Sequence, residues 1–114
     1  MAKLDHYREA IQTVLLEYAK TRTSTSSNSA LQIQPIFDLQ RDHYQLVTVG
    51  WYHDKRVYSP LFHLDIQNKK IWLQLNTTED DITLDLMRLG VAKEDIVLGF
   101  QAPHIRQFTE FSAG

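Results

Sequence analysis

The stretch of residues 41–75 constrains the fold of this chain most strongly, because its pattern predicts three consecutive β-strands. Two-residue turns at Asp54-Lys55 and Asn68-Lys69 divide it into runs in which apolar residues recur at every second position. With these turns, the apolar residues of both hairpins fall on one face, and a shift by one residue in either hairpin would scatter them. The sequence therefore predicts an antiparallel meander.

The two predicted turns also fix which residues face one another. The first hairpin would pair Trp51 with Tyr58, Val49 with Pro60 and Val47 with Phe62, and the second would pair Ile66 with Ile71, Leu64 with Leu73 and Phe62 with Leu75. The opposite face would then carry a mixed set that includes Tyr44, Leu46, His63, Asp65 and Trp72. A solvated face would be more polar, so we expect a C-terminal tail, a second subunit or another protein to cover it.

Helical periodicity flanks the meander on both sides. Residues 4–20 place apolar side chains at i, i+3, i+4 and i+7 and predict an amphipathic helix. A second helix should follow Thr77 and Thr78, which would cap it, with Ile82, Leu86 and Leu89 facing inward and Gly90 at its end. Residues 31–34 alternate as a strand, and Pro35 favours an edge strand or an early bend. The predicted fold class is α+β, a mainly antiparallel four-stranded sheet with helices packed on one face.

The remaining segments are predicted as connections. The hydroxyl-rich run 21–29 predicts a mobile linker, and residues 93–96 a short helical turn. Residues 97–114 predict an extended tail held by Phe100, Phe108 and Phe111. The isolated Gly50 indicates a bulge or a close backbone approach.

Length and composition limit the number of domains and the cellular location to be expected. A chain of 114 residues with 43% hydrophobic residues predicts one domain over 1–114. The absence of cysteine excludes disulfides and thiolate zinc sites and fits a reducing cytoplasm. The N-terminus has no apolar signal segment, and no run is long enough for a membrane span. We therefore expect a cytoplasmic protein.

The charge balance disfavours direct binding of nucleic acid. The formal net charge is -2, from 12 basic and 14 acidic residues, whereas DNA-binding proteins usually show a basic excess or a basic stripe. If the chain bound DNA as an accessory protein, the basic residues at the two ends of the sheet would be the candidates: Arg41, Lys55, Arg56, Lys69 and Lys70.

No catalytic constellation emerges from the motifs. His63 and Asp65 share one strand face and would offer two metal ligands, but the predicted register turns His43 toward the core, so the set stays incomplete. Arg41-Asp42-His43 lacks the downstream asparagine and glycine-rich loop of a kinase. We predict no catalytic residues, no metal and no cofactor. The less favoured alternative is a small metal-dependent hydrolase that uses His63 and Asp65.

Trp72 is the side chain most suited to a protein interface. Its neighbours Ile71 and Leu73 point to the core, so the indole should lie on the mixed face beside Asp65. Cover by the chain's own tail is the equal alternative.

Several short segments of the chain resemble the XisI-like family. Its members are small cyanobacterial proteins known as excision controlling factors of a nitrogen-fixation DNA element. The resemblance rests on Arg41-Asp42-His43-Tyr44-Gln45-Leu46 with Gly50-Trp51, on Arg56-Val57-Tyr58, on His63-Leu64-Asp65-Ile66 with Lys70-Ile71-Trp72-Leu73-Gln74, and on Gly90-Val91 with Lys93-Glu94-Asp95-Ile96-Val97-Leu98-Gly99-Phe100. It departs from the usual family pattern at Asn68-Lys69, Ser59-Pro60, Ala92 and Gln101-Ala102.

The resemblance implies an accessory role in developmentally regulated site-specific recombination. It also implies a companion excision factor with a nuclease-like fold, and it brings no catalytic residues. We therefore predict a non-enzymatic protein that binds this companion, or forms a homodimer, through Tyr44, Leu46, His63, Asp65 and Trp72 or through the acidic surface of the second helix.

Overall fold

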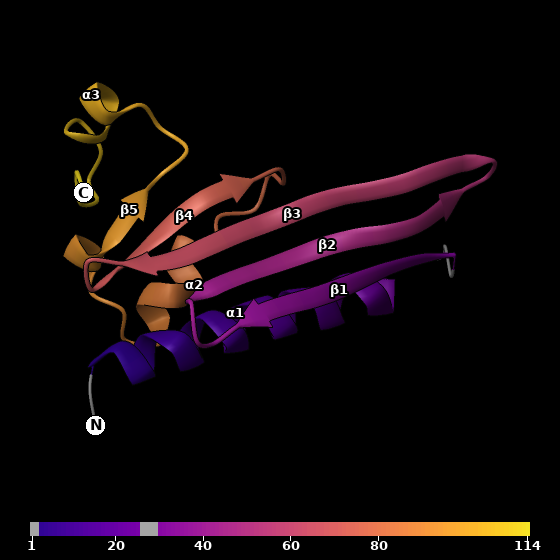
Figure 1. Cartoon of the computed structure of the whole chain (residues 1–114), viewed down its shortest axis with the longest axis horizontal. Helices are drawn as coiled ribbons and strands as arrows, with labels where there is room; N and C mark the ends of the chain where they lie inside the picture. The colour runs from indigo at the N-terminus through magenta and orange to yellow at the C-terminus, as the bar shows by residue number, and fades with distance from the viewer. Residues whose placement is uncertain (1–2, 26–29) are drawn as a thin grey trace.

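Five strands in the spatial order β1-β2-β3-β4-β5 form the sheet of this protein, as a computed structural model of the chain shows (Figure 1). The structure describes residues 3–25 and 30–114. The elements in chain order are α1 (Lys3–Thr25), β1 (Leu31–Asp38), β2 (His43–Tyr52), β3 (Lys55–Gln67), β4 (Lys70–Asn76), α2 (Thr83–Arg88), η1 (Lys93–Asp95), β5 (Ile96–Leu98) and α3 (Pro103–Arg106). None of the described helices combines the length and apolar character that a membrane span requires.

The α+β class is confirmed, whereas the predicted number of four strands is wrong. Strands β1 to β4 pair antiparallel, and β5 adds a fifth strand parallel to β4. Its first residue, Ile96, was predicted in the short helical turn and its other two in the tail, because so short an apolar run gives no separate strand signal. β1 is an edge strand and contains Pro35, as predicted.

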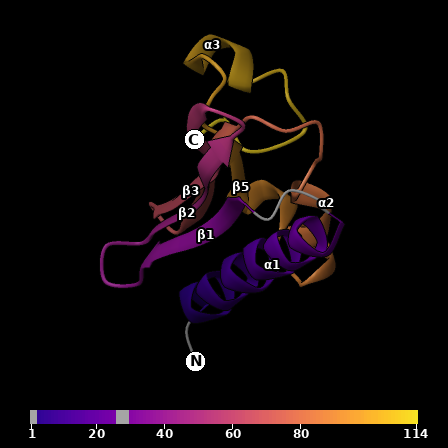
Figure 2. The same cartoon turned by 90° about the vertical axis from the view of Figure 1, so that its right-hand side faces the viewer.

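One face of the sheet is covered by helices α1 and α2 (Figure 2). The buried side chains of α1 and α2 form one core with those of the sheet, and the largest of them are Tyr7, Ile11, Leu15, Tyr44, Leu46, Phe62, Leu64, Ile71, Ile82, Leu86 and Ile96. This arrangement confirms that both predicted helices pack on one face. It also leaves the opposite face, which we call the outer face, free of α1 and α2.

The first hairpin turns one residue earlier than predicted. Its turn residues are His53 and Asp54, and Tyr52 pairs with Lys55. Between the pairs Leu46 with Phe62 and Val47 with Pro60, a bulge leaves Leu61 without a partner in β2. The predicted pairs of Trp51, Val49 and Val47 are therefore wrong.

The second hairpin matches the prediction near its turn. Asn68 and Lys69 both have positive φ angles, 52° and 64°, and Ile66 pairs with Ile71 and Leu64 with Leu73. A second bulge at Gln74 then shifts Phe62 from the predicted Leu75 to Asn76.

The bulge at Leu61 divides the β2–β3 hairpin into two parts. Residues 43–46 and 62–67 form the base, which lies over the helices, and residues 48–59 form a long arm that extends away from β4 (Figure 1). Gly50 lies in the arm with a φ of 149°, and a Cβ there would meet the carbonyl oxygen of Ala30 at 2.0 Å. The predicted close backbone approach at Gly50 is confirmed.

Several segment boundaries differ from the prediction. α1 continues to Thr25, so residues 21–25 are helical and not a linker; residues 26–29 lie outside the described part of the chain. α2 begins only at Thr83, where Asp81 Oδ1 accepts a bond from the backbone N–H at 3.0 Å, and neither Thr77 nor Thr78 caps it. Leu89 is 38% exposed instead of inward-facing.

The predictions for the end of α2 are confirmed, whereas those for the C-terminal segment are confirmed only in part. Gly90 ends the helix with a φ of 95°, and η1 forms the predicted short helical turn. In the C-terminal segment, Phe111 packs against the core, but Phe100 and Phe108 are 48% and 78% exposed and do not hold it in place.

Candidate functional site

The outer face of the base carries a row of three side chains from three adjacent strands. His43 of β2 pairs with Asp65 of β3, which in turn pairs with Trp72 of β4. The neighbouring row, with Tyr44 paired to Leu64 and Leu64 to Leu73, is buried against the helices. Because successive strand residues point to opposite faces, the row of His43 lies on the outer face.

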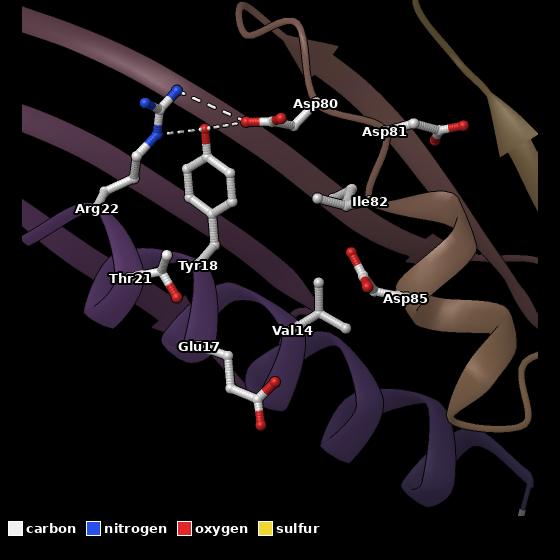
Figure 3. A pocket seen from close by; sticks show the side chains of 9 residues that line it. All are labelled: Val14, Glu17, Tyr18, Thr21, Arg22, Asp80, Asp81, Ile82 and Asp85. Carbon is white, nitrogen blue, oxygen red and sulfur yellow. Dashed lines mark hydrogen bonds and ion pairs between the residues drawn. The ribbon is translucent and has the colours of Figure 1, made fainter. Parts of the chain in front are cut away.

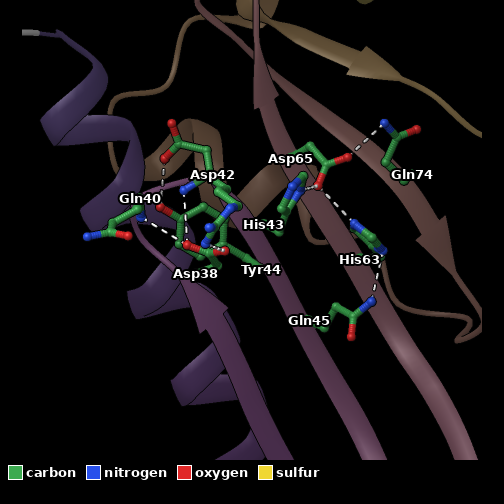
Figure 4. Close-up of polar contacts among 10 residues, drawn as sticks. Asp38, Gln40, Asp42, His43, Tyr44, Gln45, His63, Asp65 and Gln74 are labelled. Carbon is green, nitrogen blue, oxygen red and sulfur yellow. Dashed lines mark hydrogen bonds and ion pairs between the residues drawn. The ribbon is translucent and has the colours of Figure 1, made fainter.

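Four polar side chains converge on the buried carboxylate of Asp65 or on a histidine bound to it (Figure 4). Asp65 Oδ1 lies 2.7 Å from His43 Nδ1 and 2.8 Å from His63 Nε2. Gln74 Nε2 donates to the other oxygen, Oδ2, at 3.1 Å, and the amide of Gln45 lies 3.0 Å from His63 Nδ1. We call these five residues the Asp65 cluster.

The contacts within this cluster change the acidity of its members. Burial raises the pKa of Asp65, but the hydrogen bonds from His43, His63 and Gln74 outweigh it and leave the pKa below its usual value. The hydrogen bond to Asp65 raises the pKa of His43. The carboxylate is therefore kept in its charged form, although its side chain is only 9% exposed.

A second polar contact fixes the start of β2 beside the cluster. Asp42 has a positive φ of 60° and precedes His43 directly. The Arg8 guanidinium of α1 donates to Asp42 at 2.7 and 3.1 Å, and Tyr44 donates to it at 3.0 Å. The hydrogen bond from Arg8 lowers the pKa of Asp42. α1 thus holds the turn that sets the position of His43.

Trp72 is partly covered by the chain's own C-terminal segment. The Arg106 guanidinium of α3 lies 5.0 Å from the centre of the indole ring, and Trp72 Nε1 donates to the carbonyl oxygen of Gln67 at 3.3 Å. Cover by the tail, one of the two alternatives left open by the sequence, is therefore present for this side chain.

Comparison with known proteins places the chain in a family. The family model described as XisI protein matches residues 1–113. The chain belongs to the XisI family. Two solved structures from Anabaena variabilis are similar to it: a XisI-like protein, 40% identical with a TM-score of 0.88, and the fdxN element excision controlling factor XisI, 36% identical with a TM-score of 0.82. The matches cover 98% and 99% of this chain and 100% of each relative. No curated protein matches the chain.

In this member of the XisI family, the predicted partner-binding residues divide between the two faces of the sheet. His63, Asp65 and Trp72 lie together on the outer face, whereas Tyr44 and Leu46 are fully buried in the core. Their predicted place on the outer face is wrong, because the bulge at Leu61 changes the register by one residue.

The same change of register places His43 on the outer face. The prediction turned His43 toward the core, opposite to His63, but its side chain is 52% exposed and bonded to Asp65. His43, Gln45 and Gln74 are therefore cluster members that the predicted site did not include. The matching spacing of His43-x-Gln45 and His63-x-Asp65 was a signal for them, since both pairs alternate on one strand face.

The candidate DNA-contacting residues of this XisI-family chain lie at opposite ends of the sheet, as expected. Lys55 and Arg56 lie near the tip of the arm, where Arg56 stacks on Trp51, and Arg41, Lys69 and Lys70 lie at the base. At the base, Arg41 pairs with Asp38, and Lys70 donates to Ser112 and Gly114. The five residues do not form one contiguous stripe.

The acidic surface of α2 borders a hollow of about 490 Å³ between α1 and α2 (Figure 3). Its carboxylates are engaged by neighbouring side chains. Asp80 accepts from Tyr18 at 2.9 Å, Asp81 accepts from the backbone N–H of Thr83 at 3.0 Å, and Asp85 accepts from Arg88 at 2.8 Å. These three carboxylates are therefore bonded within the chain.

Proposed function

We propose that this protein is an accessory factor in the controlled excision of a DNA element, and that it acts by binding a companion protein instead of catalysing a reaction. The observation that carries the proposal is its similarity to the fdxN element excision controlling factor XisI, over 99% of this chain at 36% identity. The family match over residues 1–113 supports the same role.

The outer face supports the binding part of this proposal. On the arm, Trp51 and Tyr58 are 50% and 69% exposed, and their pairing with Arg56 and Val49 places both on the same face as the Asp65 cluster. Tryptophan and tyrosine contribute most often to binding energy at protein interfaces. We propose that the companion contacts this face from Trp72 at the base to Tyr58 on the arm.

The contacts of the Asp65 cluster contain no pair of nucleophile and base. Both histidines direct a ring nitrogen at the same oxygen of Asp65 and not at a nucleophilic side chain. Direct DNA binding has weaker support, because the candidate basic residues are separated and several of them are engaged in contacts within the chain.

The test is co-expression with a companion of the nuclease-like type, followed by affinity capture and light scattering. We expect a stoichiometric complex, and the double variant Trp51→Ala, Tyr58→Ala should weaken it tenfold or more. The matched control is Leu16→Ala, since Leu16 is 48% exposed but lies on α1.

The other outcomes of this experiment are equally informative. A homodimer without bound companion would assign the outer face to self-association. Failure to form any complex would contradict the proposal, and binding that falls steeply with added salt to DNA alone would favour the DNA-binding alternative.

A further inference from the structure

We propose that His43, His63 and Asp65 form a binding site for one divalent transition-metal ion of the zinc class. Each residue offers one ligand atom, and these atoms all lie within 4.8 Å of one another. Two histidines and one carboxylate are a common ligand set for such ions. The proposal concerns this chain alone and does not depend on a companion.

The two contacts to Asp65 are slightly shorter than the spacing of ligand atoms around an ion. The two histidine nitrogens lie 2.7 and 2.8 Å from Asp65 Oδ1. In a tetrahedral zinc site with bonds of about 2.0–2.1 Å, neighbouring ligand atoms are roughly 3.3 Å apart. Each of the two contacts to Asp65 Oδ1 would have to lengthen by roughly half an ångström, which rotation about the side-chain bonds can supply. The ion would then replace the protons of the two hydrogen bonds.

The backbone holds the three ligands on rigid elements. His43 and Asp65 are direct partners in adjacent antiparallel strands, and His63 lies two residues before Asp65 on the same strand face. The Arg8 contact to Asp42 fixes the residue before His43. Ligands carried by paired strands keep their spacing better than ligands on loops.

Two amides provide the outer contacts that metal ligands usually have. Gln74 Nε2 donates to Asp65 Oδ2 and leaves Oδ1 for the ion. If His63 Nε2 binds the ion, its Nδ1 carries the proton and donates a hydrogen bond to the Gln45 amide oxygen, once rotation of the terminal group has exchanged it with the Nε2 now at 3.0 Å. Such hydrogen bonds orient imidazole ligands and strengthen their binding.

The chemistry of the site also selects among cations. Imidazole nitrogens suit zinc, copper, nickel and iron, whereas magnesium and calcium prefer oxygen ligands. The side chain of Asp65 is only 9% exposed, and a dication would compensate the negative charge of this buried carboxylate. His43 is 52% exposed, so a fourth position faces solvent and would take water or a donor from another molecule.

The first measurement is zinc binding to the purified full-length protein after treatment with a chelator and dialysis. Calorimetric titration with zinc ions should give one site per chain with a micromolar or lower Kd. Cobalt(II) should give the visible absorption of a four-coordinate ion with histidine ligands. A wild-type protein that binds neither ion saturably would overturn the proposal, whatever the variants do.

The variants locate the site. His63→Ala and the isosteric Asp65→Asn should each weaken zinc binding tenfold or more, with far-UV circular dichroism confirming that the variants fold. The matched control is His53→Ala, since His53 lies in the turn at the far end of the same hairpin and should leave the Kd unchanged. Equal affinity of wild type, His63→Ala and Asp65→Asn would overturn the assignment.

Discussion

The base and the arm of the β2–β3 hairpin are built from the same two strands, yet they differ in what surrounds them. At the base, Phe62 and Leu64 are fully buried beneath α1 and α2. On the arm, Trp51 and Tyr58 are 50% and 69% exposed. The two regions carry similar numbers of apolar side chains, so exposure follows from the position of the helices and not from hydrophobicity.

This comparison separates stability from binding within one hairpin. Buried side chains at the base stabilise the fold, because removing them would leave a cavity. Exposed aromatic side chains on the arm contribute little to folding and remain accessible to a partner. The Asp65 cluster lies on the outer face of the base, where paired strands carry it and solvent is near.

The largest expected difference between the two regions is in stability. Phe62→Ala at the base should lower the free energy of unfolding by about 3–5 kcal/mol, whereas Tyr58→Ala on the arm of the same strand should change it by less than about 0.5 kcal/mol. Denaturant unfolding of both variants measures this difference. Similar losses in the two variants would show that the arm is as well packed as the base.

A smaller loss of stability should follow from removing the hydrogen bonds that Asp95 accepts on the helical side of the sheet. Asp95 of η1 accepts hydrogen bonds from Tyr7 at 2.5 Å and Lys3 at 2.9 Å. Asp95→Asn should lower the free energy of unfolding by about 1–3 kcal/mol near neutral pH. The exposed neighbour Glu94 provides the matched control, since Glu94→Gln should have little effect.

The effect of Asp95 should depend on pH. Burial raises the pKa of Asp95, but the bonds from Tyr7 and Lys3 outweigh it and lower the pKa below its usual value. A carboxylate with a lowered pKa in the folded state stabilises the fold above about pH 4 and loses this contribution as pH falls through the folded-state pKa. The difference between wild type and Asp95→Asn should therefore shrink below about pH 4, and a constant difference would contradict this assignment.

The smallest expected change in stability compares a residue of the base turn with a strand residue beside the arm turn. Lys69 has a φ of 64° at the base turn, a conformation that costs about 1 kcal/mol for a residue with a side chain. Lys69→Gly should therefore raise the free energy of unfolding by up to about 1 kcal/mol. Lys55→Gly, in a regular strand position at the arm, should give no gain, and a gain there would contradict this reason.

Much of the helical side could be predicted from the sequence because its signals are local. The apolar spacing of residues 4–20 identified α1 and the face it buries, and Gly90 marked the end of α2 with its positive φ. The turn at Asn68-Lys69 fixed the pairing of β3 with β4 near that turn. Each of these features depends on residues close together in the chain.

The site was predicted only in part, because strand alternation is sensitive to a single extra residue. His63, Asp65 and Trp72 were placed on the correct face through the second hairpin, whose register was right near its turn. Tyr44 and His43 were exchanged between the faces, because the predicted first hairpin had no bulge. Along the arm, both β2 and β3 carry apolar residues on each face. The distribution of apolar residues therefore could not show that the predicted register of the first hairpin was wrong.

The sequence by itself thus determined the α+β class, the helical faces and the family. Tertiary structure decided where the bulges at Leu61 and Gln74 lie, that residues 96–98 pair with β4, and that His43 meets His63 at Asp65. The physical reason is that local propensity selects helix or strand, whereas register depends on contacts between residues distant in sequence. A bulge moves the following residues of a strand to the opposite face, and the alternation of apolar and polar residues in the sequence does not reveal where this happens.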